Sequence, residues 1–154
     1  MTGKTARERS SARLAAVQAL YLMDMTGAPV DKVLDDFLHH GLGGEPEAEE
    51  RLAIPDPLLF TDILRGAVER GQDLDAMVGQ ALSGDWSVER LENILRAILR
   101  AGAYELTARP DVPMKVVISE YVDLAYAFYS GPEPGLVNAV LDRIGKVVRD
   151  VSQP

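Results

Sequence analysis

Hydrophobic residues recur three and four positions apart along almost the whole chain. This spacing places apolar side chains on one face of an α-helix, whereas a half-buried strand would show strict alternation. Helices are predicted over residues 7–25, 30–40, 56–82, 87–108, 114–129 and 135–149. No segment carries the pattern of a strand or a hairpin turn. We therefore expect an all-α fold, a compact bundle of six to seven helices around one core.

Two features stand outside this periodic pattern. Residues 41–55 are rich in glycine, proline and acidic side chains, and are predicted to form a mobile acidic surface loop. Their four glutamates suggest a cation site as an alternative. An EF-hand loop, however, needs alternating oxygen ligands and a central glycine, and this segment has neither, so a solvated loop is favoured. Trp86, the single tryptophan, precedes the predicted helix 87–108, where it either packs at the helix start or stacks on a base.

Composition limits the chemistry available to the chain. Its 154 residues, 47% hydrophobic and 26% charged, fit one globular domain spanning residues 1–154. The absence of cysteine excludes disulfides, thiolate catalysis and cysteine-ligated zinc. His39 and His40 are neighbours on a predicted helix and point about 100° apart, so they cannot bind one metal ion together. We expect neither a cofactor nor a metal site.

The sequence also lacks the motifs of common enzyme classes, including phosphate-binding loops, nucleophile elbows and zinc-protease motifs. This favours a binding protein over an enzyme. No apolar run is long enough to span a membrane, and the N-terminal residues lack the apolar core of a secretory signal. We therefore expect a soluble, cytoplasmic protein.

Charge is distributed unevenly along the chain. The net charge of −8 taken alone disfavours a nucleic-acid partner. Residues 1–13, however, carry four basic side chains and one acidic, whereas the remaining residues carry 12 basic and 23 acidic, a balance of −11. Charges more than about 8–10 Å away are screened in physiological salt, so a phosphate would respond to this basic arm. The alternative is that these arginines are simply solvated on the first helix.

Three separated segments resemble the NusB family of transcription antitermination factors: residues 7–21 (RERSSARLAAVQALY), 99–125 (LRAGAYELTARPDVPMKVVISEYVDLA) and 136–142 (LVNAVLD). The resemblance covers nearly the whole chain, in the family's order and spacing. It implies an all-α, NusB-like fold, in agreement with the periodicity. It also implies a small RNA-binding adaptor that performs no catalysis.

The resemblance further implies the partners. Members of the family bind the boxA element of nascent ribosomal RNA together with ribosomal protein NusE. The complex joins RNA polymerase and other Nus factors and suppresses premature termination on ribosomal RNA operons. Because the family contains both monomers and dimers, a homodimer that covers the basic arm remains an alternative state.

The family's RNA-binding residues lie mainly at the arginine-rich start of the first helix. Here Arg9 and Arg13 match that motif, and Lys4 and Arg7 lie nearby. Arginine suits this role because its planar guanidinium meets a phosphate in two parallel hydrogen bonds and stacks on bases. Tyr21 is expected either to stack on a base or to be buried in the core, and core burial is favoured.

The chain departs from the family pattern at several positions. Ser10 and Ser11 stand where the family often has arginines, so we expect RNA affinity to be weaker or to depend more on the partner. The segment 130–135 is a second expected contact region, but it lacks the family's lysine. Ser119 replaces the usual asparagine, so a hydrogen bond near Glu120 is expected to differ.

Two other functions fit parts of this pattern. The acidic body suits a basic protein partner, so the chain could be a protein-interaction module without direct RNA contact. A helical domain of this kind also begins certain ribosomal-RNA cytosine methyltransferases, but those enzymes use a catalytic cysteine, and this chain has none. The RNA-binding adaptor is therefore the leading hypothesis.

Overall fold

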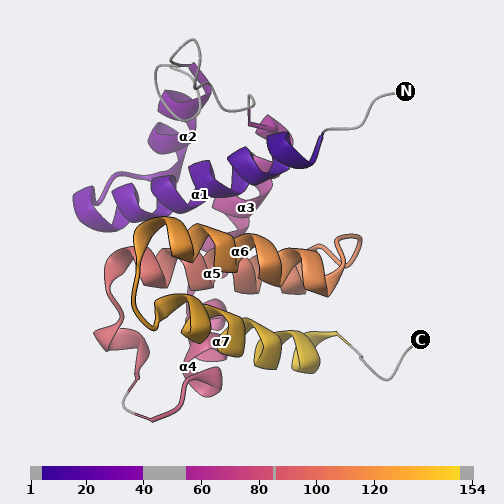
Figure 1. Cartoon of the computed structure of the whole chain (residues 1–154). Helices are drawn as coiled ribbons and strands as arrows, with labels where there is room; N and C mark the ends of the chain where they lie inside the picture. The colour runs from indigo at the N-terminus through magenta and orange to yellow at the C-terminus, as the bar shows by residue number, and fades with distance from the viewer. Residues whose placement is uncertain (1–4, 40–54, 85, 150–154) are drawn as a thin grey trace.

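The computed structural model describes residues 5–39, 55–84 and 86–149. These residues form seven α-helices and one short 3-10 helix, and they contain no strand (Figure 1). The elements are α1 (Ala6–Thr26), α2 (Val30–His39), α3 (Pro57–Glu69), α4 (Gly71–Ala81), η1 (Val88–Arg90), α5 (Asn93–Ala108), α6 (Met114–Phe128) and α7 (Glu133–Val148). The predicted all-α bundle is confirmed. The predicted acidic loop lies outside the described residues except for Pro55.

Two predicted helices have different bounds in the structure. The segment 56–82 is divided at Arg70, whose backbone angles (φ −104°, ψ 18°) end α3 and start α4. The division lets α3 pack on α1 while α4 packs on α5 and α7. The helix expected from residue 87 begins only at Asn93, because Leu91 and Glu92 are extended. Leu91 is buried although its backbone is extended, and it also fits the apolar spacing of a helix, so hydrophobic spacing could not reveal this break.

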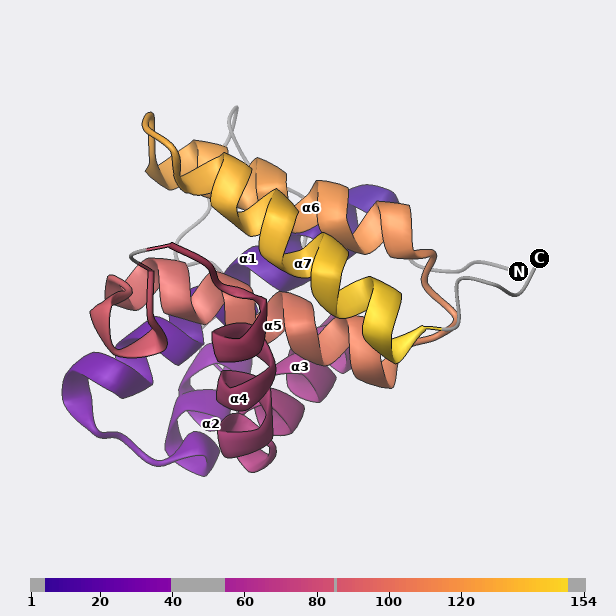
Figure 2. The ribbon, with the colours of Figure 1, turned by 90° about the horizontal axis from the view of Figure 1, so that it is seen from below.

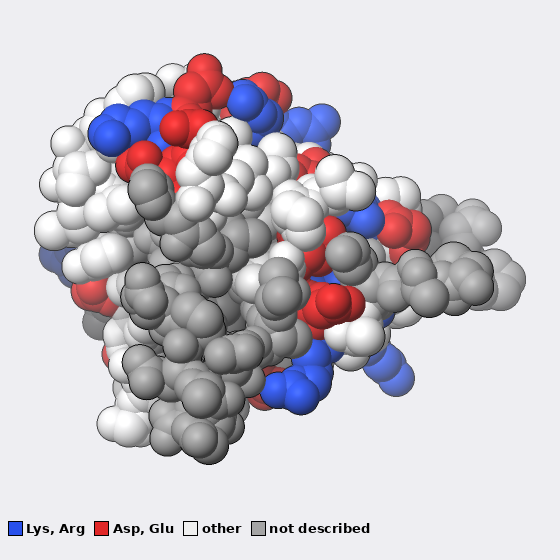
Figure 3. All heavy atoms as spheres, turned by 90° about the horizontal axis from the view of Figure 1, so that it is seen from above, with Lys and Arg blue, Asp and Glu red and all other residues white. Residues whose placement is uncertain are grey.

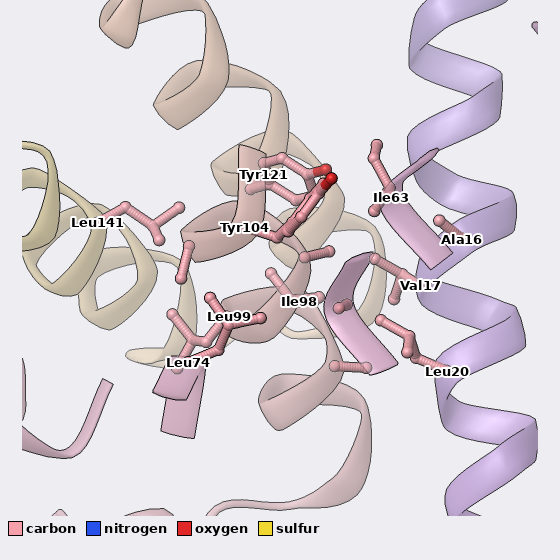
Figure 4. Close-up of a cluster of buried hydrophobic side chains, with 14 of the residues drawn as sticks. Ala16, Val17, Leu20, Ile63, Leu74, Ile98, Leu99, Tyr104, Tyr121 and Leu141 are labelled. Carbon is pink, nitrogen blue, oxygen red and sulfur yellow. The ribbon is translucent and has the colours of Figure 1, made fainter. Parts of the chain in front are cut away.

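Helix α5 is the centre of the bundle. It contacts α1 and α3 on one side and α4, α6 and α7 on the others (Figures 1 and 2). Ten of its 16 residues are buried, which is the pattern of a helix surrounded by protein. In Figure 4, side chains from α1, α3, α4, α6 and α7 converge on α5 residues such as Ile98 and Leu99.

Helix α1 packs against the bundle through small side chains. Ala12, Ala15, Ala16 and Ala19 are at most 1% exposed, so the backbone of α1 can approach α3 and α5 closely. Val17 and Leu20 are buried as well, whereas Met25, near the end of the helix, is 55% exposed.

A second close approach joins α3 to α5. The Tyr104 ring lies over Gly66, where an added Cβ would come within 2.1 Å of the ring. The Tyr104 hydroxyl donates to Asp62 Oδ1 at 2.6 Å, and Asp62 Oδ2 accepts from Arg109 Nη1 at 2.9 Å. Burial and the Asp62 carboxylate raise the pKa of Tyr104 to about 12. The phenol therefore remains a hydrogen-bond donor at neutral pH.

Candidate nucleic-acid interface

The start of α1 is an ordered and anchored helical turn. Thr5 Oγ1 accepts the Glu8 N–H at 3.0 Å, and Glu8 Oε1 accepts the Thr5 N–H at 2.7 Å, which forms a capping box. The Glu8 carbonyl also accepts the Asp56 N–H at 3.1 Å, so the start of α3 is fixed to this turn. Any ligand at this turn would meet a structure that is already ordered.

Arg7 and Arg9 lie in this first turn. Arg7 is exposed and Arg9 is half-buried. The positive end of the helix dipole adds to the charge of these two guanidinium groups. Lys4, the other basic residue expected here, lies outside the described residues. The first turn therefore provides two arginines to an approaching anion.

Arg13 occupies a different environment, because its side chain is only 2% exposed. Its Nε and Nη2 atoms donate to Glu105 Oε1 and Oε2 at 2.9 and 2.6 Å, and its Nη1 donates to Glu120 Oε1 at 3.2 Å. The sequence pattern suggests that this guanidinium binds RNA. In the structure it lies inside the fold and is held by two carboxylates, so it does not form part of the accessible surface. We therefore assign Arg13 a structural role.

The Arg13 cluster, defined here as Ser10, Arg13, Glu105, Glu120 and Tyr121, joins three helices. Glu105 comes from α5 and is fully buried, and Tyr121 from α6 donates to its Oε1 at 2.9 Å. Glu120, also from α6, accepts from Ser10 Oγ at 2.5 Å. These contacts connect α1 to α5 and α6 through charged and hydroxyl groups.

The protonation states of Arg13 and Tyr121 follow from their burial and from the neighbouring Glu105 carboxylate. Burial lowers the pKa of Arg13, but the hydrogen bond and charge of Glu105 raise it more, so the net pKa lies above its ordinary value. Burial beside the Glu105 carboxylate raises the pKa of Tyr121 well above its ordinary value. The guanidinium therefore stays charged, and the phenol stays a donor, at neutral pH.

One signal in the sequence could have revealed this cluster, although the sequence analysis did not use it. Glu105 is the single charged residue in the apolar stretch 101–106 (AGAYEL), where a carboxylate that faces the core must find a partner. The expectation that Ser119 alters a hydrogen bond near Glu120 stays a prediction; the hydrogen bonds that Glu120 makes in the structure come from Ser10 and Arg13. Sequence spacing could not identify these partners, because they lie 107 and 110 residues away.

Tyr21 lies on the same helix as the arginines but farther along. It is half-buried, so it is neither fully enclosed in the core nor fully exposed for stacking on a base, the two alternatives expected from the sequence. Fourteen residues separate it from Arg7, which corresponds to about 21 Å along a helix axis. Tyr21 is therefore separate from the first turn, and a ligand that reaches both must be extended.

The second expected contact region, residues 130–135, lies toward the side of the bundle on which α1 ends (Figure 1). The Tyr129 hydroxyl before it contacts Glu92 just before α5, and Asn93 of α5 donates to Met25 near the end of α1. Burial and Glu92 raise the pKa of Tyr129 above its ordinary value. The first turn, Tyr21 and this segment therefore follow one direction along α1.

Charge on the described surface is mixed. Figure 3 shows Lys and Arg side chains next to Asp and Glu, in separate small groups rather than as one broad basic face. Among the described residues, Arg100 pairs with Asp75 and Arg109 with Asp62 and Asp111. On this face an anion would therefore be attracted to local positions rather than to the face as a whole.

Other candidate sites are weaker. Trp86 is 38% exposed and lines a cleft with Val88 and Arg96, between α4 and α5. His39 pairs with Asp35 on the exposed surface of α2, and His40 lies outside the described residues. Within the described ranges, no three His, Asp or Glu side chains are placed to hold a metal ion. No helix in these ranges is long and apolar enough to cross a membrane.

Comparison with known proteins identifies relatives along nearly the entire chain. The model of the NusB family matches residues 10–146. Transcription antitermination protein NusB of Bradyrhizobium diazoefficiens is 50% identical over 149 residues, which cover 97% of this chain and 90% of that protein. The protein of the same name from Brucella ovis is 52% identical over 150 residues, covering 97% of this chain and 87% of the relative.

Solved structures share the fold. NusB of T. maritima has a TM-score of 0.74 and 26% identity, covering 94% of this chain and 93% of its own. A NusB chain crystallised with NusE and dsRNA has a TM-score of 0.71 and 22% identity, covering 93% of this chain and 99% of its own. At that identity the second comparison shows the shared fold alone. The family match, the sequence relatives and the fold agree, and this chain belongs to the NusB family.

Proposed function

We propose that this protein is an RNA-binding transcription antitermination factor of the cytoplasm. It binds boxA-type RNA of nascent ribosomal transcripts together with ribosomal protein NusE, and acts with RNA polymerase and other Nus factors. The observation that carries this proposal is about 50% identity to transcription antitermination proteins over 97% of the chain. A related fold crystallised with NusE and RNA supports the choice of partners. No catalytic step is needed.

The RNA contacts are assigned to the first turn of α1. Arg7 and Arg9 supply guanidinium groups for phosphates, on a turn that the capping box and Asp56 hold in place. Tyr21 and the segment 130–135 lie farther in the same direction, so a single strand would follow α1. Burial of Arg13 leaves less positive charge at the surface, which supports a strong dependence on the partner protein.

A mobility-shift titration with boxA RNA, with and without NusE, tests this assignment. The variant Arg7→Glu with Arg9→Glu should lose the shift and keep its helical circular dichroism. The matched control, Arg70→Glu with Arg90→Glu, makes the same change in net charge at two exposed positions outside α1. An unchanged shift in the first variant would exclude the first turn from RNA binding.

The same titration separates the second candidate function. The balance of −11 outside residues 1–13 favours a basic protein partner, and burial of Arg13 reduces the basic surface further. Capture of NusE without any RNA shift, by the protein alone or by the complex, would favour a protein-interaction module.

A further inference from the structure

Glu120 occupies the edge of the Arg13 cluster, where α6 meets the start of α1. Its Oε1 accepts from Ser10 Oγ at 2.5 Å and from Arg13 Nη1 at 3.2 Å. Its side chain is 25% exposed, whereas Glu105 is fully buried. Helix α1 packs mainly on α3 and α5 and contacts α6 little, so Glu120 adds a polar link between α1 and α6.

The two carboxylates of the cluster therefore have different consequences for the fold. If Glu105 were removed, a buried guanidinium would lose three of its hydrogen bonds. If Glu120 were removed, Arg13 would keep its three hydrogen bonds to Glu105, so no buried charge would be left unpaired. The main effect of losing Glu120 should fall on Ser10, one residue after Arg9.

We propose that Glu120 is a positioning residue for RNA binding, holding Ser10 and Arg13 so that Arg7 and Arg9 keep a fixed direction toward the RNA. This inference rests on the proposed function. Its physical basis is that one side-chain oxygen on α6 accepts hydrogen bonds from two residues of α1, which restrains the start of α1 against α6. A first turn held on both sides, by Asp56 and by Glu120, loses less conformational entropy when it binds.

The competing effect of Glu120 is electrostatic. A partly exposed carboxylate near the first turn would repel phosphates, and removing it would then strengthen binding. Two substitutions separate these effects. Glu120→Gln removes the charge but keeps a side-chain oxygen that can accept from Ser10 and Arg13, whereas Glu120→Ala removes both.

The experiment measures boxA RNA affinity and the exchange of backbone amides in residues 6–10, using the full chain with NusE. We expect Glu120→Ala to bind about three- to tenfold more weakly and to exchange these amides faster, as for the loss of one hydrogen bond of ordinary strength. Glu120→Gln should stay within about twofold of the wild type. Asp123→Ala, at an exposed position on the same helix, is the matched control.

Ser10→Ala provides an independent approach from the other side of the bond. It should weaken binding in the same direction, and the double variant with Glu120→Ala should bind no more weakly than Glu120→Ala alone. If the wild type binds RNA and Glu120→Ala binds equally well or more tightly, the positioning role is wrong and the proposed function stands. If the wild type with NusE binds no boxA RNA, both the positioning role of Glu120 and the proposed function are wrong.

Discussion

Arg13 joins α1 to the rest of the bundle through a single guanidinium group. Its 2% exposure and its paired bonds to Glu105 place a full positive charge inside the fold. An intact buried ion pair adds little net stability, because loss of hydration offsets the attraction between the charges. Removing one partner is costly, because the other charge is then buried alone.

Arg13→Ala should therefore destabilise the protein by about 3–5 kcal/mol. Arg7→Ala, at an exposed position on the same helix, should stay within about 0.5 kcal/mol of the wild type. Urea denaturation followed by circular dichroism measures both. A stable Arg13→Ala protein that has lost RNA binding would show that Arg13 contacts RNA and would contradict its structural role.

Tyr121 should make the protein sensitive to alkaline pH. Its pKa in the fold lies well above the unfolded value of about 10, so its contribution is complete below that pH and is lost as pH rises further. Tyr121→Phe should be less stable at pH 8 but lose less stability between pH 8 and 11. Urea midpoints across this range test the difference. Because Tyr104 and Tyr129 also have raised pKa values, the variant should retain part of the slope, and identical slopes would contradict the prediction.

At the scale of the elements, the bundle depends on where the helices approach one another. Gly66 in α3 meets the ring of Tyr104 in α5, and Gly102 in α5 meets Leu141 in α7. Protein interiors are close-packed, so an added methyl group at such a crossing must push a neighbour away. Among the described glycines, those with open space at the Cβ position, such as Gly71, have no such constraint.

Gly66→Ala should cost about 1–3 kcal/mol, because the new Cβ would lie 2.1 Å from the Tyr104 ring. Gly71→Ala is the matched control. It lies at the start of α4 with no atom within 4 Å of an added Cβ, and should be neutral or stabilising by up to about 1 kcal/mol. Thermal and urea unfolding distinguish the two, and equal stabilities would show that α3 can shift away from α5.

The first turn of α1 links helix capping to binding. Thr5→Ala removes the side-chain acceptor for the Glu8 N–H and should cost about 0.5–2 kcal/mol. Because the turn that carries Arg7 and Arg9 would fray, RNA affinity should fall as well. Thr26→Ala, at the other end of α1, should leave affinity unchanged. If Thr5→Ala lowers stability without affecting RNA binding, order in this turn is irrelevant to recognition.

At the scale of the whole molecule, a protein of net charge −8 is proposed to bind a polyanion. On the face seen in Figure 3 basic and acidic groups are intermixed, so attraction at that face must come from a few positions. Net repulsion disfavours non-specific binding to RNA, and under the proposed function NusE would provide the additional contacts. This division of roles agrees with a co-binding adaptor better than with an independent RNA-binding protein.

The number of phosphate contacts can be measured from the salt dependence of binding. For a single strand, the logarithm of affinity should change with the logarithm of salt concentration by about 0.7 per phosphate contact. Arg7→Gln should therefore reduce the slope by about 0.7, and Arg90→Gln should leave it unchanged. An unchanged slope for Arg7→Gln would show that Arg7 contacts no phosphate.

Local pattern determined the secondary structure and the class of fold. Helical spacing depends only on neighbours three and four residues away, so it was sufficient to predict an all-α bundle and most helices. It could not predict the break at Arg70 or the late start of α5, because buried residues such as Leu91 fit either conformation. The resemblance to the NusB family rested on three segments of sequence and needed no structure.

Only the tertiary structure decided the role of each arginine. Arg7, Arg9 and Arg13 are the same residue type within seven positions, and nothing local distinguishes a surface guanidinium from a buried one. The difference comes from Glu105 and Glu120, which lie 92 and 107 residues beyond Arg13 and reach it only when α5 and α6 pack against α1. A buried charge requires a partner brought by the rest of the chain, and that partner is a property of the fold.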